Sequence, residues 1–208
     1  MAVFALVTTD MSQMSERIRQ GRSTIFHPGA HDGSGEQAGL EAIAARLDRC
    51  IATANAPTVR LLMETTAGQG TCLGHRLEHL AAIRDLCTTP ERLFVCVDTC
   101  HMLAAGYELR TQEGWEATWA EFDRLLGPGL LKAMHVNDSK RDLGSRVDRH
   151  ELLGEGHLGA EPFRRLITEP RFKDVPLLLE TPEGEEHYAQ EVAWMRQWLE
   201  GQGSQAGA

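Results

Sequence analysis

Five short apolar runs, each closed by a polar or ionisable residue, alternate with segments of helical periodicity along most of the chain. The runs cover approximately Ser23 to His27, Val59 to Glu64, Leu93 to Asp98, Leu130 to Asn137 and Val175 to Glu180. Such an alternation is typical of βα units built around a parallel sheet. The pattern therefore predicts an α/β fold with about five parallel strands.

The intervals between these runs carry Leu, Ile, Ala and Trp at helical spacing. The predicted helices are Gly35 to Ala54, Leu73 to Leu86, Glu113 to Leu126, Glu161 to Thr168 and Glu186 to Glu200, with a further helix-like stretch from Ser12 to Gln20. We expect the helices to pack outside the sheet in a single domain over residues 1–200. The Gly, Ser, Gln and Ala residues of 201–208 predict a disordered tail.

Composition limits the classes of protein that fit. No apolar stretch reaches the roughly 20 residues of a membrane helix, and the first ten residues lack the pattern of a signal peptide. Five cysteines without a CxxC pair argue against a disulfide framework and favour a reducing cytoplasm. The net charge of -9 weakens a nucleic-acid hypothesis, because phosphate is neutralised by Lys and Arg. Bound divalent cations would offset part of that charge at the site itself.

Residue types suited to metal binding lie at or near the end of every predicted strand. These are His27, Glu64, Asp98, His135 (two before its strand end) and Glu180. Side chains at these positions face the ligand site of parallel α/β folds, which lies beyond the carboxyl ends of the strands. Three more candidates are His101 in DTCH and Asp148 and His150 in DRH. Four carboxylates and four imidazoles predict a polynuclear site for zinc or manganese.

A long connection from Asp138 to Gly159 interrupts the βα rhythm with charges and glycines. Loops of that length are usually functional. Three of its basic residues, Lys140, Arg146 and Arg149, are candidates for contact with DNA phosphates. The glycines of AGQG and GEGHLG are interpreted as backbone turns that line the site, since neither motif has the form of a nucleotide-binding loop.

Several local motifs resemble one known family, in the same order and at similar intervals. They are FHPGAH, ETTAGQG, VCVDTCHMLAAGYELRT, MHVNDSK, GSRVDRHELLGEGHLG and PLLLET. The sequence from His27 to about Trp198 is similar to the endonuclease IV family of apurinic/apyrimidinic endonucleases. The resemblance implies a TIM-barrel-like (β/α)8 fold with a cluster of three zinc ions, for which Mn²⁺ could substitute.

Carried over by position, the resemblance implies a ligand set for each zinc ion. The first ion would be bound by His27 and Glu64. The second would be bound by Glu64, Asp98, His135 and Glu180. The third would be bound by His101, Asp148 and His150. Asp148 and His150 are two residues apart in an extended segment, so they share a face and can converge on one ion.

The reaction implied by the resemblance is hydrolysis of the phosphodiester 5′ to an abasic site in double-stranded DNA. A hydroxide held between the first two zinc ions would attack phosphorus, and the third ion would stabilise the departing 3′ oxygen. Glu64 and Glu180 are the residues assigned to catalysis. Neither an organic cofactor nor a membrane is expected to take part.

The family has eight strands, and only the last five are recognisable in this chain. One missing strand would supply another histidine to the first zinc ion. The resemblance therefore implies an amino-terminally truncated, incomplete barrel, whose exposed strand edges could support self-association. A misplaced start at Met1, a true truncation and completion by a partner chain are the three explanations left open.

Two other functions fit parts of the pattern. A xylose isomerase-like sugar isomerase or epimerase would need only four of the ligands, Glu64, Asp98, His135 and Glu180. The DTCH histidine and the DRH pair favour the endonuclease, because they build a third site that such an isomerase does not need. The second alternative is a catalytically impaired metal-binding fragment of the endonuclease.

Overall fold

Five parallel strands form one sheet in the computed structural model of the chain, which describes residues 23–54 and 56–203. In spatial order they are β1 (Ser23–Phe26), β3 (Arg60–Glu64), β5 (Leu93–Asp98), β6 (Leu131–His135) and β9 (Leu177–Leu178). Every neighbouring pair is parallel. The predicted α/β fold with about five parallel strands is therefore confirmed.

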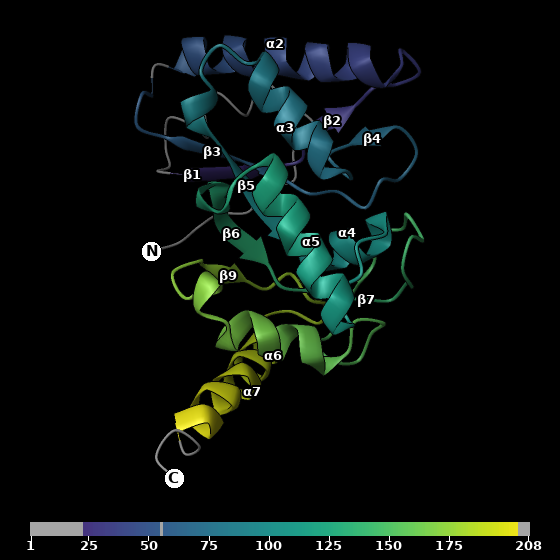
Figure 1. Cartoon of the computed structure of the whole chain (residues 1–208), viewed down its shortest axis with the longest axis vertical. Helices are drawn as coiled ribbons and strands as arrows, with labels where there is room; N and C mark the ends of the chain where they lie inside the picture. The colour runs from purple at the N-terminus through teal and green to yellow at the C-terminus, as the bar shows by residue number, and fades with distance from the viewer. Residues whose placement is uncertain (1–22, 55, 204–208) are drawn as a thin grey trace.

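Helices follow the strands in chain order along the length of the molecule (Figure 1). The longer ones are α2 (Glu36–Ala54), α3 (Leu77–Leu86), α5 (Gln112–Leu125), α6 (Ala160–Thr168) and α7 (Glu185–Gly203). A short helix, α4 (Thr99–Ala105), follows β5 directly. Single 3-10 turns precede three of the strands, namely η1 (Pro90–Arg92), η2 (Pro128–Leu130) and η3 (Pro170–Phe172). No helix within the described ranges is both long and apolar enough to cross a membrane.

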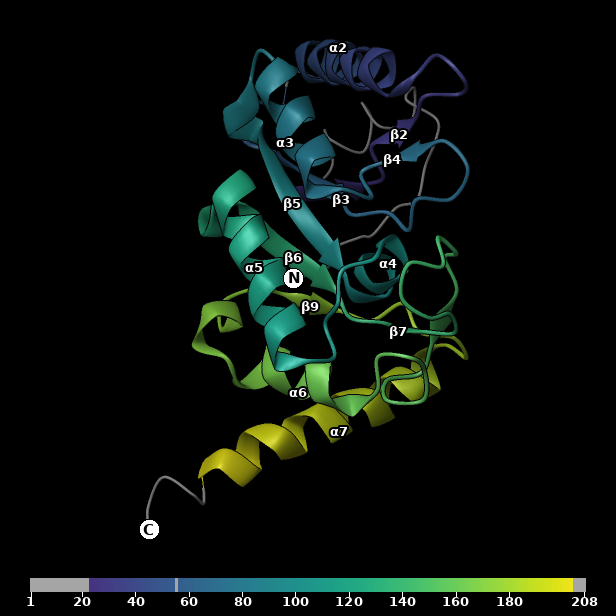
Figure 2. The ribbon, with the colours of Figure 1, turned by 45° about the vertical axis from the view of Figure 1, so that its right-hand side comes forward.

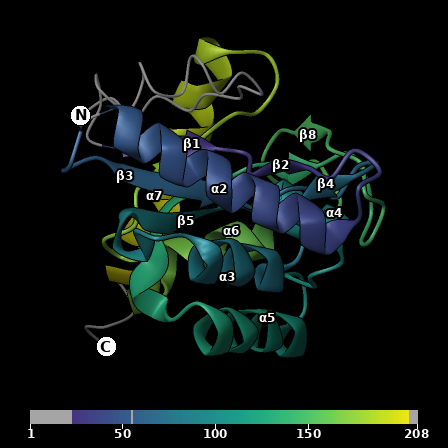
Figure 3. The same cartoon turned by 90° about the horizontal axis from the view of Figure 1, so that it is seen from above.

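Two small antiparallel ribbons stand apart from the main sheet. One pairs β2 (Gly29–Ala30) with β4 (Cys72–Leu73), and the other pairs β7 (Asp138–Ser139) with β8 (His150–Glu151). Figure 2 places β2, β4, β7 and α4 at the end of the sheet toward which the arrows of β5 and β6 point. Figure 3 places β8 at the same end. These ribbons therefore surround the carboxyl ends of the strands.

The two faces of the sheet bury different sets of apolar residues. On the face covered by the helices, a large cluster includes Met63, Val95 and Met134 with helix residues such as Phe122 and Phe163. On the opposite face, a small separate cluster consists of Ile25, Leu62, Cys96 and Ala133, with Phe94 and Leu178 packed against it. Successive residues of a strand point to opposite faces, so strand side chains alternate between the two clusters.

Several predicted boundaries change. Strand β6 ends at His135, so this residue closes its strand and does not precede the strand end by two. The helix expected from Leu73 begins at Leu77, because Leu73 pairs with Gly29 in the first ribbon. Helix α7 runs through Gly203, three residues into the predicted tail. The stretch from Ser12 to Gln20 and residues 204–208 lie outside the described residues.

Candidate metal centre

Five of the predicted ligands belong to the face of the sheet that carries the small apolar cluster. They are His27, Glu64, Asp98, His135 and Glu180. Each stands two positions beyond a residue of that cluster or, for Glu180, beyond a residue packed against it; these residues are Ile25, Leu62, Cys96, Ala133 and Leu178. A spacing of two returns an extended chain to the same face. In addition, Asp98 and His135 are register partners across β5 and β6. The apolar face of the sheet therefore leads directly into a polar site at the strand ends.

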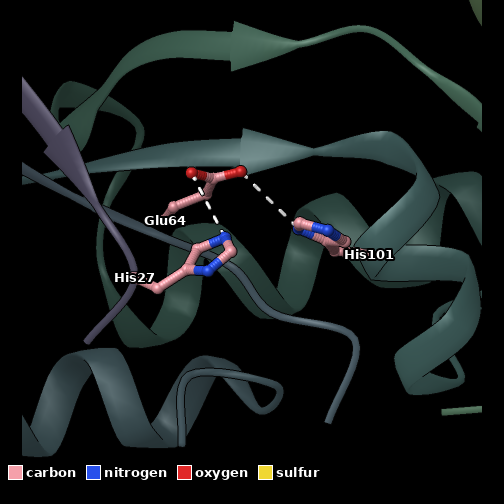
Figure 4. A group of neighbouring side chains, drawn as sticks. All are labelled: His27, Glu64 and His101. Atoms are coloured by element: carbon pink, nitrogen blue, oxygen red, sulfur yellow. Dashed lines mark ion pairs between the residues drawn. The ribbon is translucent and has the colours of Figure 1, made fainter. Parts of the chain in front are cut away.

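Glu64, at the end of β3, lies at the centre of this site (Figure 4). Its Oε1 is 2.9 Å from Nδ1 of His135 and 3.6 Å from Nδ1 of His101. Its Oε2 is 3.5 Å from Nε2 of His27. Burial of Glu64, which is 3% exposed, would raise its pKa, but His135 and His27 outweigh burial and hold the pKa well below the usual value. Glu64 is therefore an anion shared by three imidazoles.

Helix α4 presents His101 to this carboxylate. Asp98 caps the helix, since its Oδ1 accepts a hydrogen bond of 2.9 Å from the backbone N–H of His101. An N-terminal Asp of this kind satisfies a backbone donor that has no partner within the helix. Nδ1 of His101 lies 2.8 Å from the carbonyl oxygen of Thr65, which can only accept. Nδ1 therefore carries a proton, and Nε2, 3.1 Å from Oδ2 of Asp148, is the atom that can release its proton and bind a cation.

The second ribbon presents His150 in the same manner. Nδ1 of His150 lies 3.0 Å from the carbonyl oxygen of Glu180, so it donates there. Its Nε2 is 3.5 Å from Oδ1 of Asp148 and 3.6 Å from Oδ2 of Asp98. Ligating histidines commonly donate their second ring N–H to a carbonyl or carboxylate, which fixes the tautomer and the orientation of the ring. Both His101 and His150 are held in this way.

Electrostatics make the buried imidazoles unusually basic. Burial alone would lower the pKa of His101, but Asp98, Asp148 and Glu64 raise it to about 10. Burial would also lower the pKa of His135, and Glu64 and Asp98 raise it to about 9. In the metal-free protein the carboxylates therefore stabilise protonated imidazoles. A metal cation bound at the same place could take over the positive charge of these protons.

Four buried nitrogen atoms at the site have no hydrogen-bond partner among the described residues. They are the Nε2 atoms of His27, His101, His135 and His150. Buried polar atoms are normally satisfied, so the unsatisfied Nε2 atoms of His27, His101 and His150 fit a bound cation, whereas His135 faces the carboxylates of its group through Nδ1. Imidazole and carboxylate are the donors that zinc and manganese accept. The residues present therefore fit a metal cluster.

Ligand atoms converge in four groups within the described residues, and in each group they all lie within 4.8 Å of one another. One group, Glu64, Asp98, His135 and Glu180, has the same members as the set implied for the second zinc ion. The other groups are His27 with Glu64 and His101, Asp98 with His101 and His150, and Cys100 with Asp148 and His150. His101 thus lies between the positions implied for the first and third ions.

The three basic residues suggested for DNA contact are exposed on the loop that follows β7. Nζ of Lys140 is 3.8 Å from Oε2 of Glu151, and Nη1 of Arg149 donates to the carbonyl oxygen of Asp148 at 2.6 Å. Arg146 has a left-handed backbone with φ of 55°. Their role in binding DNA stays a prediction.

Sequence reasoning missed two residues that support the ligands. Nδ2 of Asn137 donates to Oδ2 of Asp98 at 2.7 Å, and its Oδ1 accepts from the backbone N–H of Glu180 at 2.8 Å. Oγ1 of Thr65 accepts from the backbone N–H of Asp98 at 2.9 Å. The positions of both residues, one and two residues after strand ends in ETTAGQG and MHVND, were the available signal.

Comparison with known proteins places the chain among proteins of this architecture. Residues 8–198 match a family described as the xylose isomerase-like TIM barrel. A probable endonuclease 4 from Chloroflexus aurantiacus is 52% identical over 162 residues, which are 78% of this chain and 57% of that protein. A probable endonuclease 4 from Geobacter sulfurreducens is 50% identical over 175 residues, 84% of this chain and 59% of that protein. The chain thus spans less than two thirds of the length of these curated relatives.

Solved structures agree with this placement. The endonuclease IV of Thermus thermophilus superposes with a TM-score of 0.76 at 32% identity, covering 95% of this chain and 73% of that one. A D-tagatose 3-epimerase-like protein superposes with a TM-score of 0.69 at 16% identity, covering 95% of this chain and 71% of that one, a likeness of fold alone. The predicted resemblance is confirmed: the chain belongs to the endonuclease IV family of the xylose isomerase-like TIM-barrel group.

Proposed function

We propose that this chain is a zinc-dependent phosphodiesterase of DNA repair that cleaves double-stranded DNA on the 5′ side of abasic sites. The observation that carries the proposal is the convergence of four carboxylates and four imidazoles at one end of the sheet, with unsatisfied imidazole nitrogens among them. The similarity to endonuclease 4 proteins supports DNA as the substrate.

Each residue of the cluster has a place in the proposal. Three zinc ions would be held by His27, Glu64, Asp98, His101, His135, Asp148, His150 and Glu180. Bound metal would supply positive charge to the phosphate and lower the pKa of the attacking water. Glu64 and Glu180 would fix the metals around the reacting phosphate, because both carboxylates lie close to Nδ1 of His135, at 2.9 and 3.3 Å. Lys140, Arg146 and Arg149 would contact DNA phosphates.

A sugar isomerase would need only the group of Glu64, Asp98, His135 and Glu180. The endonuclease is favoured by the second cluster of donors, in which His101 and His150 both approach Asp148, at 3.1 and 3.5 Å. In addition, identity to endonuclease 4 proteins reaches 52%, whereas the epimerase-like structure is 16% identical. The donors around Asp148 and the sequence identity to endonuclease 4 proteins therefore both favour the endonuclease over the isomerase.

The proposal is tested by elemental analysis of the purified chain together with a nicking assay on duplex DNA that carries one abasic site. We expect three zinc ions per chain and a nick on the 5′ side of the abasic site. Retention of fewer than two ions would contradict the metal cluster. Three ions with an intact DNA strand would contradict the reaction while leaving the metal cluster supported.

Replacing His150 tests the assignment of the third ion. His150→Ala is expected to lower the zinc content by up to one ion per chain, because it removes a ligand while the group around Glu64 and His135 keeps its donors. The matched control is His157→Ala, on the same loop but exposed, which should keep all the zinc. Zinc content is measured by elemental analysis. Full retention in His150→Ala would remove this residue from the ligand set.

A further inference from the structure

Asp138 is a buried carboxylate that no part of the proposed reaction uses. It lies in β7, three residues beyond His135, and is 0% exposed. No Lys, Arg or His of the described residues lies within ion-pair distance of it. A buried charge without a counterion is costly unless hydrogen bonds stabilise it. The partners of Asp138 therefore indicate what it does.

Five backbone N–H groups surround this side chain. Its Oδ1 accepts from Ser139 at 2.7 Å and from Leu158 at 2.8 Å. Its Oδ2 accepts from Gly154 at 3.0 Å, Gly156 at 3.1 Å and Gly159 at 3.2 Å. We call these five donors the carboxylate cradle. Four of them come from one short stretch, 154–159, that lies far along the chain from Asp138. The loop after β8 is therefore folded around a carboxylate of the same chain.

The glycines of the GEGHLG motif make this arrangement possible. A Cβ atom on Gly156 would overlap Oδ1 of Asp138 and the carbonyl oxygen of Ser139. Gly159 has φ of 70°, which other residues rarely adopt. The sequence reading of these glycines as turns is thus only part of their role, since they also admit the carboxylate of Asp138.

The cradle anchors the segment that carries Asp148 and His150. At His150 itself the segment is held by the pairing of β8 with β7, where His150 is the register partner of Ser139. Beyond β8, the backbone N–H groups of the loop bond to Asp138 through the cradle and to Glu191, which accepts from the N–H of Leu153 at 2.9 Å, and the side chains of Leu153 and Leu158 pack in the large apolar cluster. The backbone N–H of His157 also reaches the carbonyl oxygen of Ser139 at 2.8 Å. The position of His150 therefore depends on a loop that Asp138 closes.

From this geometry we infer that Asp138 is a positioning residue for the third metal ion: its carboxylate organises loop 154–159 and so holds Asp148 and His150 opposite His101. The inference rests on the proposed function, because it needs a metal ion in that group. Asp138 is not a member of any of the four converging ligand groups. Its effect on metal binding is transmitted through the backbone.

The test is the metal affinity of Asp138→Asn. An amide presents a donor where one carboxylate oxygen accepts, so at least two cradle N–H groups lose their partner. Loss of a group that orients a metal ligand typically lowers metal affinity about 10- to 100-fold. We expect a loss of that size for one zinc ion, with the affinity of the other two unchanged. Asp142→Asn is the matched control, because Asp142 lies on the same loop but is exposed.

A double variant separates positioning from general destabilisation. In the His150→Ala background, which already lacks the third ion, Asp138→Asn should cause no further loss of zinc. A variant that only weakened the fold would lower the affinity of every ion in both backgrounds. Should Asp138→Asn not fold, Gly159→Ala provides the same test with the carboxylate intact, because its Cβ meets open space but its φ is strained. Full zinc affinity in the variant that folds would overturn the inference.

The two proposals fail in different ways. If His150→Ala retains as much zinc as the unmodified chain, the third ion itself is refuted. If His150→Ala loses one ion whereas Asp138→Asn binds all the zinc with unchanged affinity, only the positioning role of Asp138 is refuted.

Discussion

Glu64→Gln is expected to abolish cleavage of abasic-site DNA and to remove at least two zinc ions from the chain. Glu64 contacts three of the imidazoles, His27, His101 and His135, and belongs to two of the converging ligand groups. Loss of a partner that merely orients a ligand lowers metal affinity about 10- to 100-fold, so the loss of a shared ligand should exceed ~100-fold. Elemental analysis and the nicking assay measure the two effects.

A matched control excludes a general effect of removing a carboxylate. Glu108→Gln removes one that is partly buried and bound to Arg110, away from the strand ends. We expect this variant to keep its zinc and its cleavage rate. Circular dichroism should report the same helix content for both variants, since Gln has nearly the shape of Glu. Zinc bound at full stoichiometry by Glu64→Gln would show that Glu64 is not a ligand.

Zinc affinity should rise steeply with pH. In the metal-free protein the pKa of His101 is raised to about 10 and that of His135 to about 9, so both imidazoles are protonated at neutral pH. Zinc must displace both protons. The ligand sets place His135 at the second ion and His101 at the third, so below pH 9 the affinity for each of these two ions is expected to increase about tenfold per pH unit, one proton for each ion. Competition with a chelator at pH 6.5 and 7.5 measures this slope, and a pH-independent affinity would contradict protonated ligands.

The same two pKa shifts predict how the stability of the metal-free protein depends on pH. Both folded-state values lie above 6.5, the ordinary value for His. The contribution of the two protonated imidazoles to the free energy of unfolding is then complete below about pH 6.5 and is lost as the pH rises through 9 to 10. Denaturation with urea should therefore show the metal-free protein losing stability over this range. Zinc-loaded protein should not follow this trend, because its imidazoles have no proton to lose. Equal behaviour of the two forms would contradict the prediction.

Sequence reasoning located the parts of the site that lie at the ends of long, regular elements. Strand β5 has the predicted bounds, because LFVCVD is a continuous apolar run closed by Asp98. The same run supplied the argument that Asp98 faces the site. Glu64 was found for the same reason, since the apolar residues of β3 end at it. Apolar periodicity thus indicated both the sheet and the end of the sheet where the chemistry gathers.

The features that were missed depend on contacts rather than on periodicity. Two-residue strands such as β7 and β8 are too short to show alternation, so the ribbon that presents His150 left no pattern. The function of Asp138 depends on backbone N–H groups up to 21 residues away, which no local motif reveals. Asn137 has the same character, because its two partners lie on β5 and after β9. Such residues become visible only when the chain is folded.

Each ligand at a strand end follows an apolar residue of the small cluster, or one packed against it, at a spacing of two. This spacing limits which insertions and deletions the strands of such proteins can accept during evolution. Deleting one residue within β5 would turn Asp98 toward the helices and bring Thr99 to the ligand position, since a shift of one reverses the faces of a strand. Insertions and deletions of a single residue inside the strands should therefore be lethal to metal binding. The length of each strand is under as strong a constraint as the identity of its last residue.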